Sequence, residues 1–187
     1  MHTFSSDGVE IAFLDEGSGP PILLIHGFAS NAKTNWVDPG WVKHLNRDGY
    51  RVIALDNRGA GRSDKPFSEY SLEQMADDAI AVLDAAGADR AHVVGASMGG
   101  ALTQIIGLKY PERVISLTLA CTACRNHAWR RELLQGWATT ATERGMSAMT
   151  REAARWVIGP RSFRRLLPAF GWLGPFGASR PAHGFAA

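Results

Sequence analysis

The chain shows a recurring pattern of short apolar runs over its first 120 residues, and most are apolar on successive positions rather than on alternate ones. Successive apolar positions are typical of strands in a parallel sheet, because helices cover both faces of such strands. The runs that predict strands are Val9–Phe13, Ile22–Ile25, Tyr50–Leu55, His92–Val94 and Val114–Leu119.

Helical stretches separate the later runs. Trp41–Asp48 stands ahead of a glycine, which is a favoured residue just beyond a helix end. The sequence SLEQ at Ser71–Gln74 predicts a capping box, which opens a second helix that runs to Gly87. A third helix follows Ser97 and ends at Tyr110–Pro111, because proline disfavours the helical conformation of the residue before it. This alternation of strands and helices predicts the α/β class with a mostly parallel sheet.

The pattern changes after about Ala120. The later chain predicts helices, and residues 168–187 are rich in Gly, Pro and Ala with no strand pattern. We therefore expect a core made by residues 1–120 and a helical segment made by residues 121–187. The predicted helices are Trp129–Arg144, Ser147–Ile158 and a short one opened by Pro160, where proline is tolerated in the first turn.

Composition limits the class of protein. Of the 187 residues, 45% are hydrophobic and 20% are charged, which is ordinary for a globular domain and excludes wholesale disorder. Two cysteines are too few for a disulfide scaffold, and a net charge of +2 excludes a strongly polyanionic or polycationic chain. No apolar run approaches the roughly 18 residues of a membrane-spanning helix, and the N-terminal residues show no secretory signal. These features predict a cytoplasmic protein without a membrane partner.

Basic residues gather in the second part of the chain. Residues 121–187 contain ten arginines, no lysine and three acidic residues, whereas acidic residues are in excess over residues 1–120. The arginines are spread around predicted helices that also carry tryptophans, and the sequence has no zinc spacing and no recognised nucleic-acid motif. A solvated helix face, or a surface that meets another part of the protein, is favoured over nucleic-acid binding.

The strongest chemical signal is the sequence GASMG at Gly95–Gly99, which follows a predicted strand and opens a predicted helix. A serine on a sharp strand-to-helix turn exposes its Oγ, and only small neighbours tolerate the strained backbone. The N-terminus of the helix favours negative charge that develops beside it. The alternative is a glycine-rich turn with an incidental serine. The context favours Ser97 as a nucleophile, with Gly95 and Gly99 supporting the turn.

A second signal is the tripeptide His26-Gly27-Phe28, which follows the apolar run Ile22–Ile25. A loop in this position supplies a backbone N–H to the oxygen that becomes negative during acyl transfer. We expect the N–H groups of Phe28 and Met98 to converge on that oxygen. His26, hydrogen-bonded to the backbone, and Gly27 are expected to support the site.

The loop Asp56–Asp64 closes the strand Tyr50–Leu55, and its glycines permit a tight turn. Asp56 and Arg58 are a candidate ion pair that braces this loop beside the serine. A purely structural role for the loop is the favoured interpretation.

Cys121 and Cys124 have the spacing of a redox pair. A thioredoxin-like site is expected in a βαβ context of its own, whereas this pair follows the run Val114–Leu119. Thiols that are buried or that line a pocket are therefore favoured, and a redox or metal function is the alternative.

Four motifs together resemble the α/β-hydrolase superfamily, in the branch of small esterases, enol-lactonases and haloperoxidase-like enzymes. In chain order they are GPPILLIHGF, LDNRGAGRSDKP, HVVGASMGG and YPERV. The resemblance is specific over residues 8–120, and residues 121–187 resemble the family's helical cap. It implies that Ser97 is the nucleophile, that Phe28 and Met98 are the oxyanion donors, and that neither a metal nor an organic cofactor is needed. The implied substrate is a small carboxylic ester or lactone.

The sequence departs from this family in one respect. The family places an Asp or Glu and then a His after the serine, each following a further strand, and no strand pattern follows Leu119. A strand with its crossover takes about 30 residues, so the resemblance implies a C-terminally truncated chain that lacks the last strands, the acid and the base. We expect this chain to be inactive by itself, unless His127 or His183 folds back as the base. The alternative is a non-catalytic protein that binds a small ligand.

The same departure concerns the last predicted strand, Val114–Leu119. With no later strand beside it, this strand would stand at an uncovered edge of the sheet. Exposed edges pair with other chains, so we expect self-association through this edge.

Overall fold

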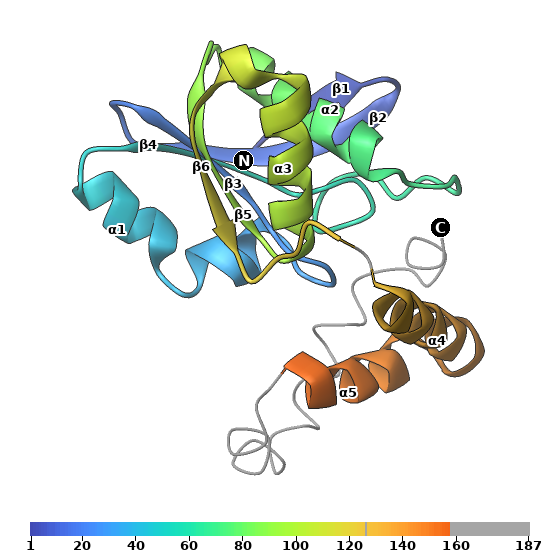
Figure 1. Ribbon diagram of the computed structural model, residues 1–187. Helices are drawn as coiled ribbons and strands as arrows, with labels where there is room; N and C mark the ends of the chain where they lie inside the picture. Colours follow the sequence, from blue (N-terminus) through green and yellow to red (C-terminus); the bar gives the residue numbers. More distant parts are fainter. Residues whose placement is uncertain (126, 158–187) are drawn as a thin grey trace. The chain divides into compact units, whose positions relative to one another are not determined.

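The computed structural model describes residues 1–125 and 127–157 (Figure 1). The chain divides into two compact units. The first comprises Met1–Pro66 and Tyr70–Cys124, and of the described residues the second comprises Phe67–Glu69, Arg125 and residues 127–157. That the second unit acts as a cap stays a prediction.

The strands of the first unit form one sheet in the order β1-β2-β4-β3-β5-β6. Neighbours from β4 to β6 are parallel, whereas β1 pairs antiparallel with β2 and β2 pairs antiparallel with β4. This is the mostly parallel α/β sheet that the sequence predicts, and all five apolar runs form strands. The strands are β1 (His2–Ser6), β2 (Val9–Glu16), β3 (Pro21–Ile25), β4 (Arg51–Leu55), β5 (Ala91–Ala96) and β6 (Val114–Ala120).

The hydrophobic pattern alone does not predict β1, because this strand is short, mostly polar and largely exposed. The turn that joins it to β2 consists of Asp7 and Gly8, whose φ angles are 49° and 79°. Positive φ at both central residues is the geometry of the two-residue hairpin turn that matches the twist of the strands. The Asp-Gly pair is therefore the sequence signal that identifies this hairpin.

The helices of the first unit lie close to their predicted positions. They are α1 (Trp41–Arg47), α2 (Leu72–Ala85) and α3 (Met98–Lys109), together with a π-helix η1 (Lys33–Val37) and a 3₁₀ turn η2 (Pro111–Arg113). The Ser71 hydroxyl accepts a hydrogen bond of 3.0 Å from the backbone N–H of Gln74, as the predicted capping box requires. The π-helix is not predicted by the pattern, although its Trp36 side chain is buried.

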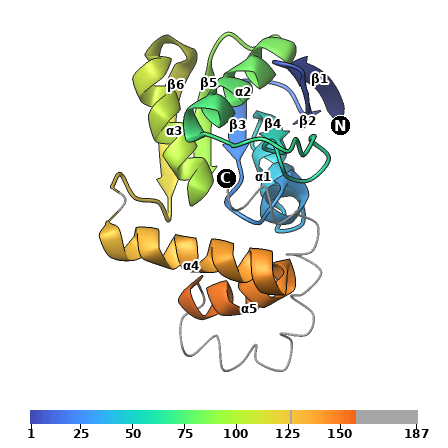
Figure 2. The same cartoon turned by 90° about the vertical axis from the view of Figure 1, so that its right-hand side faces the viewer.

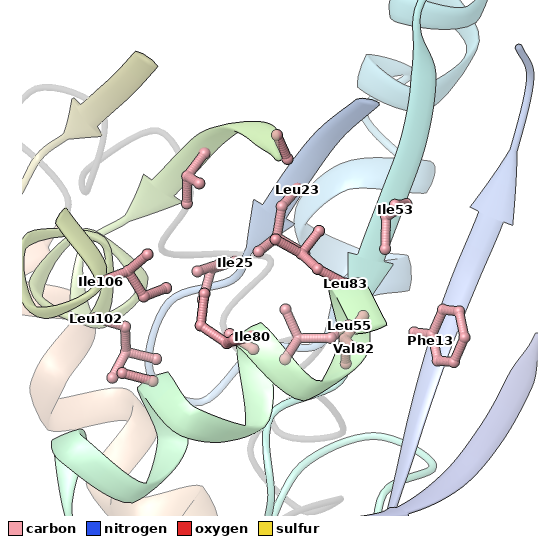
Figure 3. Close-up of a cluster of buried hydrophobic side chains, with 14 of the residues drawn as sticks. Phe13, Leu23, Ile25, Ile53, Leu55, Ile80, Val82, Leu83, Leu102 and Ile106 are labelled. Carbon is pink, nitrogen blue, oxygen red and sulfur yellow. The ribbon is translucent and has the colours of Figure 1, made fainter. Parts of the chain in front are cut away.

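Helices cover both faces of the sheet, with α2 and α3 on one face and α1 on the other (Figures 1 and 2). In β3, Leu23 and Ile25 belong to the larger core, whereas Ile22 and Leu24 belong to the smaller core around Trp36. Figure 3 shows the larger core, where side chains of α2 and α3 lie against those of β3 and β4. Because β3 fills both cores, it needs apolar residues on successive positions.

Strand β6 forms one edge of the sheet, next to β5. Ile115, Leu117 and Leu119 keep 45%, 41% and 47% of their surface exposed. The strand contains neither a charged residue nor a proline, although exposed edges are usually protected by such residues. Within the described residues the expected uncovered edge is therefore confirmed, and self-association through it stays a prediction.

The second unit contains the helices α4 (Ala128–Arg144) and α5 (Met146–Val157), which pack against each other. Trp137, Ala141 and Met149 are buried, and Gly145 joins the two helices with a φ of 83°. The predicted short helix at Pro160 lies outside the described residues. None of the helices in the described part of the chain has the length and apolarity needed to cross a membrane.

Candidate active site

Ser97 lies between β5 and α3 in a backbone conformation that few residues other than glycine adopt. Its φ is 54° and its ψ is −113°. Strain of this kind costs about 1–3 kcal/mol and persists only where surrounding contacts hold it. The Ser97 N–H donates to the Ala120 carbonyl on β6 at 2.9 Å, and the Ser97 carbonyl accepts from the N–H groups of Gly100 and Ala101. The serine thus occupies the sharp strand-to-helix turn that the GASMG sequence predicts.

The two glycines of this sequence are required by close backbone contacts. A methyl group on Gly95 would overlap the carbonyl oxygen of Gly99 and the hydroxyl of Thr103. A methyl group on Gly99 would overlap the carbonyl oxygens of Ile25 and His26. Helix α3 therefore approaches β3 and β5 so closely that alanine does not fit at either position.

The loop after β3 lies against the serine. Strands β3 and β5 are parallel with Ile25 opposite Gly95, so the residues two positions later meet. A Cβ atom on Gly27 would lie 3.2 Å from the carbonyl oxygen of Ala96 and 3.3 Å from the Cβ of Ser97. Gly27 thus belongs to the immediate surroundings of Ser97, and its role in supporting a catalytic site stays a prediction.

Two backbone N–H groups flank this contact. Phe28 directly follows Gly27, and Met98 directly follows Ser97 as the first residue of α3. N–H groups in the first turn of a helix have no acceptor within that helix, and the positive end of the helix dipole lies there. Each predicted oxyanion donor is therefore one residue along the chain from the contact between Gly27 and Ser97.

His26 is fully buried and its ring is held by backbone groups. Its Nε2 accepts a hydrogen bond of 3.0 Å from the N–H of Asn57, which assigns the ring proton to Nδ1. Nδ1 then donates to the Gly27 carbonyl at 2.8 Å. The neutral imidazole thereby ties the loop after β3 to the loop after β4 through the backbone hydrogen bonding expected of it, and its support of a catalytic site stays a prediction.

The candidate ion pair between Asp56 and Arg58 does not form, because each side chain has other partners. The Asp56 carboxylate accepts backbone N–H bonds from Ala32 at 2.7 Å and from Arg62 at 2.8 Å. Arg58 instead forms a buried bidentate ion pair with Asp78 of α2, with distances of 2.6 and 2.7 Å. The tight turn brings backbone donors to Asp56, whereas the Arg58 side chain reaches α2.

Sequence reasoning missed Asn57 and Asp78. Asn57 also donates from its side-chain amide to the His26 carbonyl at 3.3 Å. Asp78 lies on the buried face of α2, between Met75 and Val82 at helical spacing. A carboxylate on an apolar helix face needs a partner, and this conflict is the signal that would have identified it.

The surroundings of Ser97 contain no general base among the described residues. No hydrogen bond to the Ser97 Oγ occurs within residues 1–125 and 127–157. Of the two fallback bases, His127 is an exposed residue that precedes α4, and His183 lies outside the described residues. The same part of the chain contains no group of three or more potential metal ligands.

Both cysteines are exposed free thiols, so the prediction of buried thiols is wrong. They follow the edge strand β6, where the described residues provide no further layer to cover them. Nor do they line the hollow of about 250 Å³ found over β3, β5 and β6. The residues around that hollow are Leu24, Trp36, Trp41, Leu45, Val94, Thr118 and Ala120.

A family model and several known proteins match the sequence of this chain. The family model described as alpha/beta hydrolase fold matches residues 20–156. A rhodomycin D methylesterase from Streptomyces sp. (strain C5) is 39% identical over 117 residues, which cover 59% of this chain and 39% of the relative. The bifunctional epoxide hydrolase 2 of Sus scrofa is 37% identical over 110 residues, covering 57% of this chain and 19% of the relative.

A solved structure extends the likeness over the whole fold. An N-acyl homoserine lactone degrading enzyme superposes with a TM-score of 0.80 and 30% identity, covering 100% of this chain and 70% of that one. The match to the curated methylesterase, in contrast, spans about two-fifths of that relative's length.

Proposed function

The chain belongs to the α/β hydrolase fold family, and from this premise we propose that it hydrolyses a small carboxylic ester or lactone through an acyl-enzyme on Ser97. The observation that carries the proposal is the strained Ser97 backbone between β5 and α3, with Gly27 against its Cβ atom. Strain held at a turn between a strand and a helix is the arrangement that exposes a nucleophilic serine.

The proposed reaction follows from this arrangement. The Ser97 Oγ attacks the acyl carbon, and the negative charge that forms on the carbonyl oxygen is stabilised by the N–H groups of Phe28 and Met98. The positive end of α3 adds to this stabilisation. The alcohol leaves, and water then releases the acid from the acyl-enzyme. None of these steps requires a metal or an organic cofactor.

The identity of the nucleophile separates ester from epoxide chemistry. The relatives include an epoxide hydrolase as well as a methylesterase, so likeness alone selects neither reaction. A serine at position 97 favours acyl transfer, because epoxide opening in this family uses a carboxylate nucleophile. We therefore place the substrate among esters and lactones.

Turnover by the 187-residue chain is expected to be low. The Ser97 Oγ has no hydrogen-bonding base among the described residues. Loss of the base from a serine triad lowers kcat by about 10⁶-fold, because its members act as a unit. The oxyanion donors act independently of the base, so binding is expected to outlast catalysis.

Labelling with a fluorophosphonate tests the nucleophile. We expect slow labelling of one serine per chain, unchanged in the exposed-loop control Ser18→Ala and absent in Ser97→Ala. Equal labelling of the chain and of Ser97→Ala would refute the proposal. Hydrolysis of a p-nitrophenyl ester at a rate typical of the family would refute the low turnover, and loss of that rate in His127→Ala or His183→Ala would identify the base.

Testing Phe28 as an oxyanion donor needs a substitution that removes its backbone N–H, because the side chain does not donate. Phe28→Pro removes the N–H and is expected to slow labelling by about 10²–10³-fold. Phe28→Ala keeps the N–H and serves as the matched control. Far-ultraviolet circular dichroism of both variants separates loss of the donor from loss of the fold.

The absence of a base among the described residues also supports a second candidate, a non-catalytic protein that binds a small apolar ligand. A ligand that raises the Tm of both the chain and Ser97→Ala, without labelling or turnover, would favour this function. Under either function we propose no nucleic-acid partner, no membrane partner and a cytoplasmic location. Salt-sensitive retardation of DNA by the purified protein would contradict the first of these.

A further inference from the structure

The loop after β6 carries the only two cysteines of the chain, three residues apart. Both are free and exposed, and the chain bends at Cys121 and again at Cys124. Residues i and i+3 of any chain lie at most about 10 Å apart, so a local change of the backbone can bring the two Cα atoms to the roughly 7 Å or less that a disulfide needs. Among the described residues no third ligand joins them, and a structural zinc site needs four. The pair therefore suits a disulfide better than a metal.

The backbone of this loop is strained. Cys121 has a φ of 45°, in the left-handed region that favours glycine. A side chain other than Gly, Asn or Asp in this region costs free energy and persists where neighbouring contacts impose it. At this loop the neighbouring contacts come from the turn at Ser97 and from α3.

The last residue of β6 contacts Ser97, and the two residues between the cysteines contact α3. Ala120 accepts the hydrogen bond from the Ser97 N–H at 2.9 Å. Thr122 lies so close to Gly100 that a methyl group there would stand 2.6 Å from the Thr122 Cβ. Ala123 accepts a hydrogen bond of 3.3 Å from the side-chain amide of Gln104. The segment between the cysteines is thus fixed to the first two turns of α3.

We propose that Cys121 and Cys124 form a reversible disulfide that controls the reactivity of Ser97. The thiol pair itself rests on exposure and loop geometry, whereas the control of Ser97 rests on the proposed function. Drawing the two sulfur atoms together changes the backbone at Cys121, next to the carbonyl that holds the Ser97 N–H. Oxidation is therefore expected to disturb the turn that exposes the serine.

The oxidant is a small disulfide such as oxidised glutathione. The thiolate of one cysteine, having lost its proton to solvent, attacks a glutathione sulfur and displaces one glutathione thiolate. The second cysteine thiolate attacks the mixed disulfide and displaces the other glutathione. Two protein thiols are oxidised, one glutathione disulfide is reduced to two thiols, and the two protons end on the glutathione sulfurs.

Intact mass after equilibration with oxidised glutathione tests the thiol pair. We expect a monomer lighter by two hydrogen atoms, with no free thiol, that dithiothreitol returns to the starting mass. Stable glutathione adducts, a disulfide-linked dimer or an unchanged mass would each overturn the proposal. In Cys121→Ser and Cys124→Ser only an adduct on the remaining thiol is expected.

The rate of fluorophosphonate labelling tests the control of Ser97. We expect the oxidised chain to react several-fold more slowly than the reduced chain, and the double variant with both cysteines changed to serine to react alike under both conditions. Equal rates for the oxidised and reduced chain would overturn the control. Absence of labelling in both states would instead contradict the proposed nucleophile, while the mass measurement still decides whether the disulfide forms.

Discussion

Strands β3 and β6 flank the same strand, β5, and both are rich in β-branched and aliphatic residues, yet they meet very different surroundings. In β3, Leu23 and Ile25 are fully buried, because neighbouring strands lie on both sides and helices on both faces. In β6, Leu117 keeps 41% of its surface exposed. The comparison teaches that position in the sheet, more than apolar composition, decides how much each strand contributes to stability.

The proposed site lies where these two environments meet. The buried side supplies rigidity, since β3 leads into the loop held by His26 and Asn57. The exposed side supplies the Ala120 carbonyl that holds the Ser97 N–H. A serine turn supported by a packed strand on one side and an edge strand on the other is expected to be sensitive to changes at the edge.

The largest effect is expected on the buried side, from Asp78→Asn. This change leaves the buried Arg58 guanidinium without its counter-charge, and breaking a buried pair in this way costs about 3–5 kcal/mol. The matched control is Asp48→Asn, because Asp48 pairs with Arg47 on the surface, and we expect it to cost about 1 kcal/mol or less. Urea unfolding of the two variants measures both values. Equal costs would mean that burial of the ion pair has no bearing on stability.

The next effect compares the two environments directly, through Leu102→Ala and Leu117→Ala. Leu102 is fully buried in the larger core, where removal of a leucine side chain costs about 2–5 kcal/mol. Leu117 packs on Gly107 of α3 but is partly exposed, so we expect a cost of about 1 kcal/mol or less. The free energies of unfolding from urea titrations test the contrast. A loss at Leu117 as large as that at Leu102 would show that β6 is covered in solution.

The sequence predicts best those parts of the fold that local contacts or the buried core determine. The successive apolar residues of β3 predict a buried parallel strand correctly, because both cores constrain them. The pattern of Ser71 and Gln74 predicts the cap of α2, because the hydrogen bond is local. The same holds for the turn at Ser97, where glycine spacing reports close contacts directly.

Contacts between distant segments were harder to predict. The pairing of Arg58 with Asp78 depends on how α2 lies against the loop after β4, and nothing near Arg58 in the sequence distinguishes Asp78 from Asp56. The exposure of Cys121 depends on what lies beside β6, which composition does not report. The roles of Ser97, Phe28 and Met98 remain predictions, since geometry alone does not test chemistry.

A smaller effect on stability, but a visible one on assembly, is expected from Leu117→Lys. If the edge of β6 pairs with a second copy of the chain, a lysine in the middle of the strand will oppose that pairing. Sedimentation velocity should then show a concentration-dependent increase in mass for the unchanged chain and a smaller one for the variant. Lys43→Gln on α1 is the surface control. A chain that is monomeric at all concentrations would contradict self-association through this edge.

The smallest effect is expected at the surface contact between α2 and α3, through the pH dependence of stability. Partial burial acts to raise the pKa of the Asp77 carboxyl, but hydrogen bonds from Lys109 and Tyr110 outweigh it and lower the pKa below its ordinary value of 3.8. A pKa that is lower in the folded state stabilises the fold above the unfolded value, and this contribution is lost as the pH falls through the folded value. The side chains of Lys109 and Asp77 are 45% and 46% exposed, so solvent screening keeps the effect on stability small.

Asp77→Asn tests this contribution. The variant should have a lower urea midpoint than the unchanged chain at about pH 7, and the difference should shrink towards about pH 3, where the carboxyl is increasingly protonated. Glu112→Gln, which changes an exposed carboxylate elsewhere on the first unit, is the matched control and should show a smaller difference at neutral pH. If the difference in urea midpoint between the unchanged chain and Asp77→Asn grows as the pH falls, the prediction is contradicted. The carboxyl would then stabilise the fold in its protonated form.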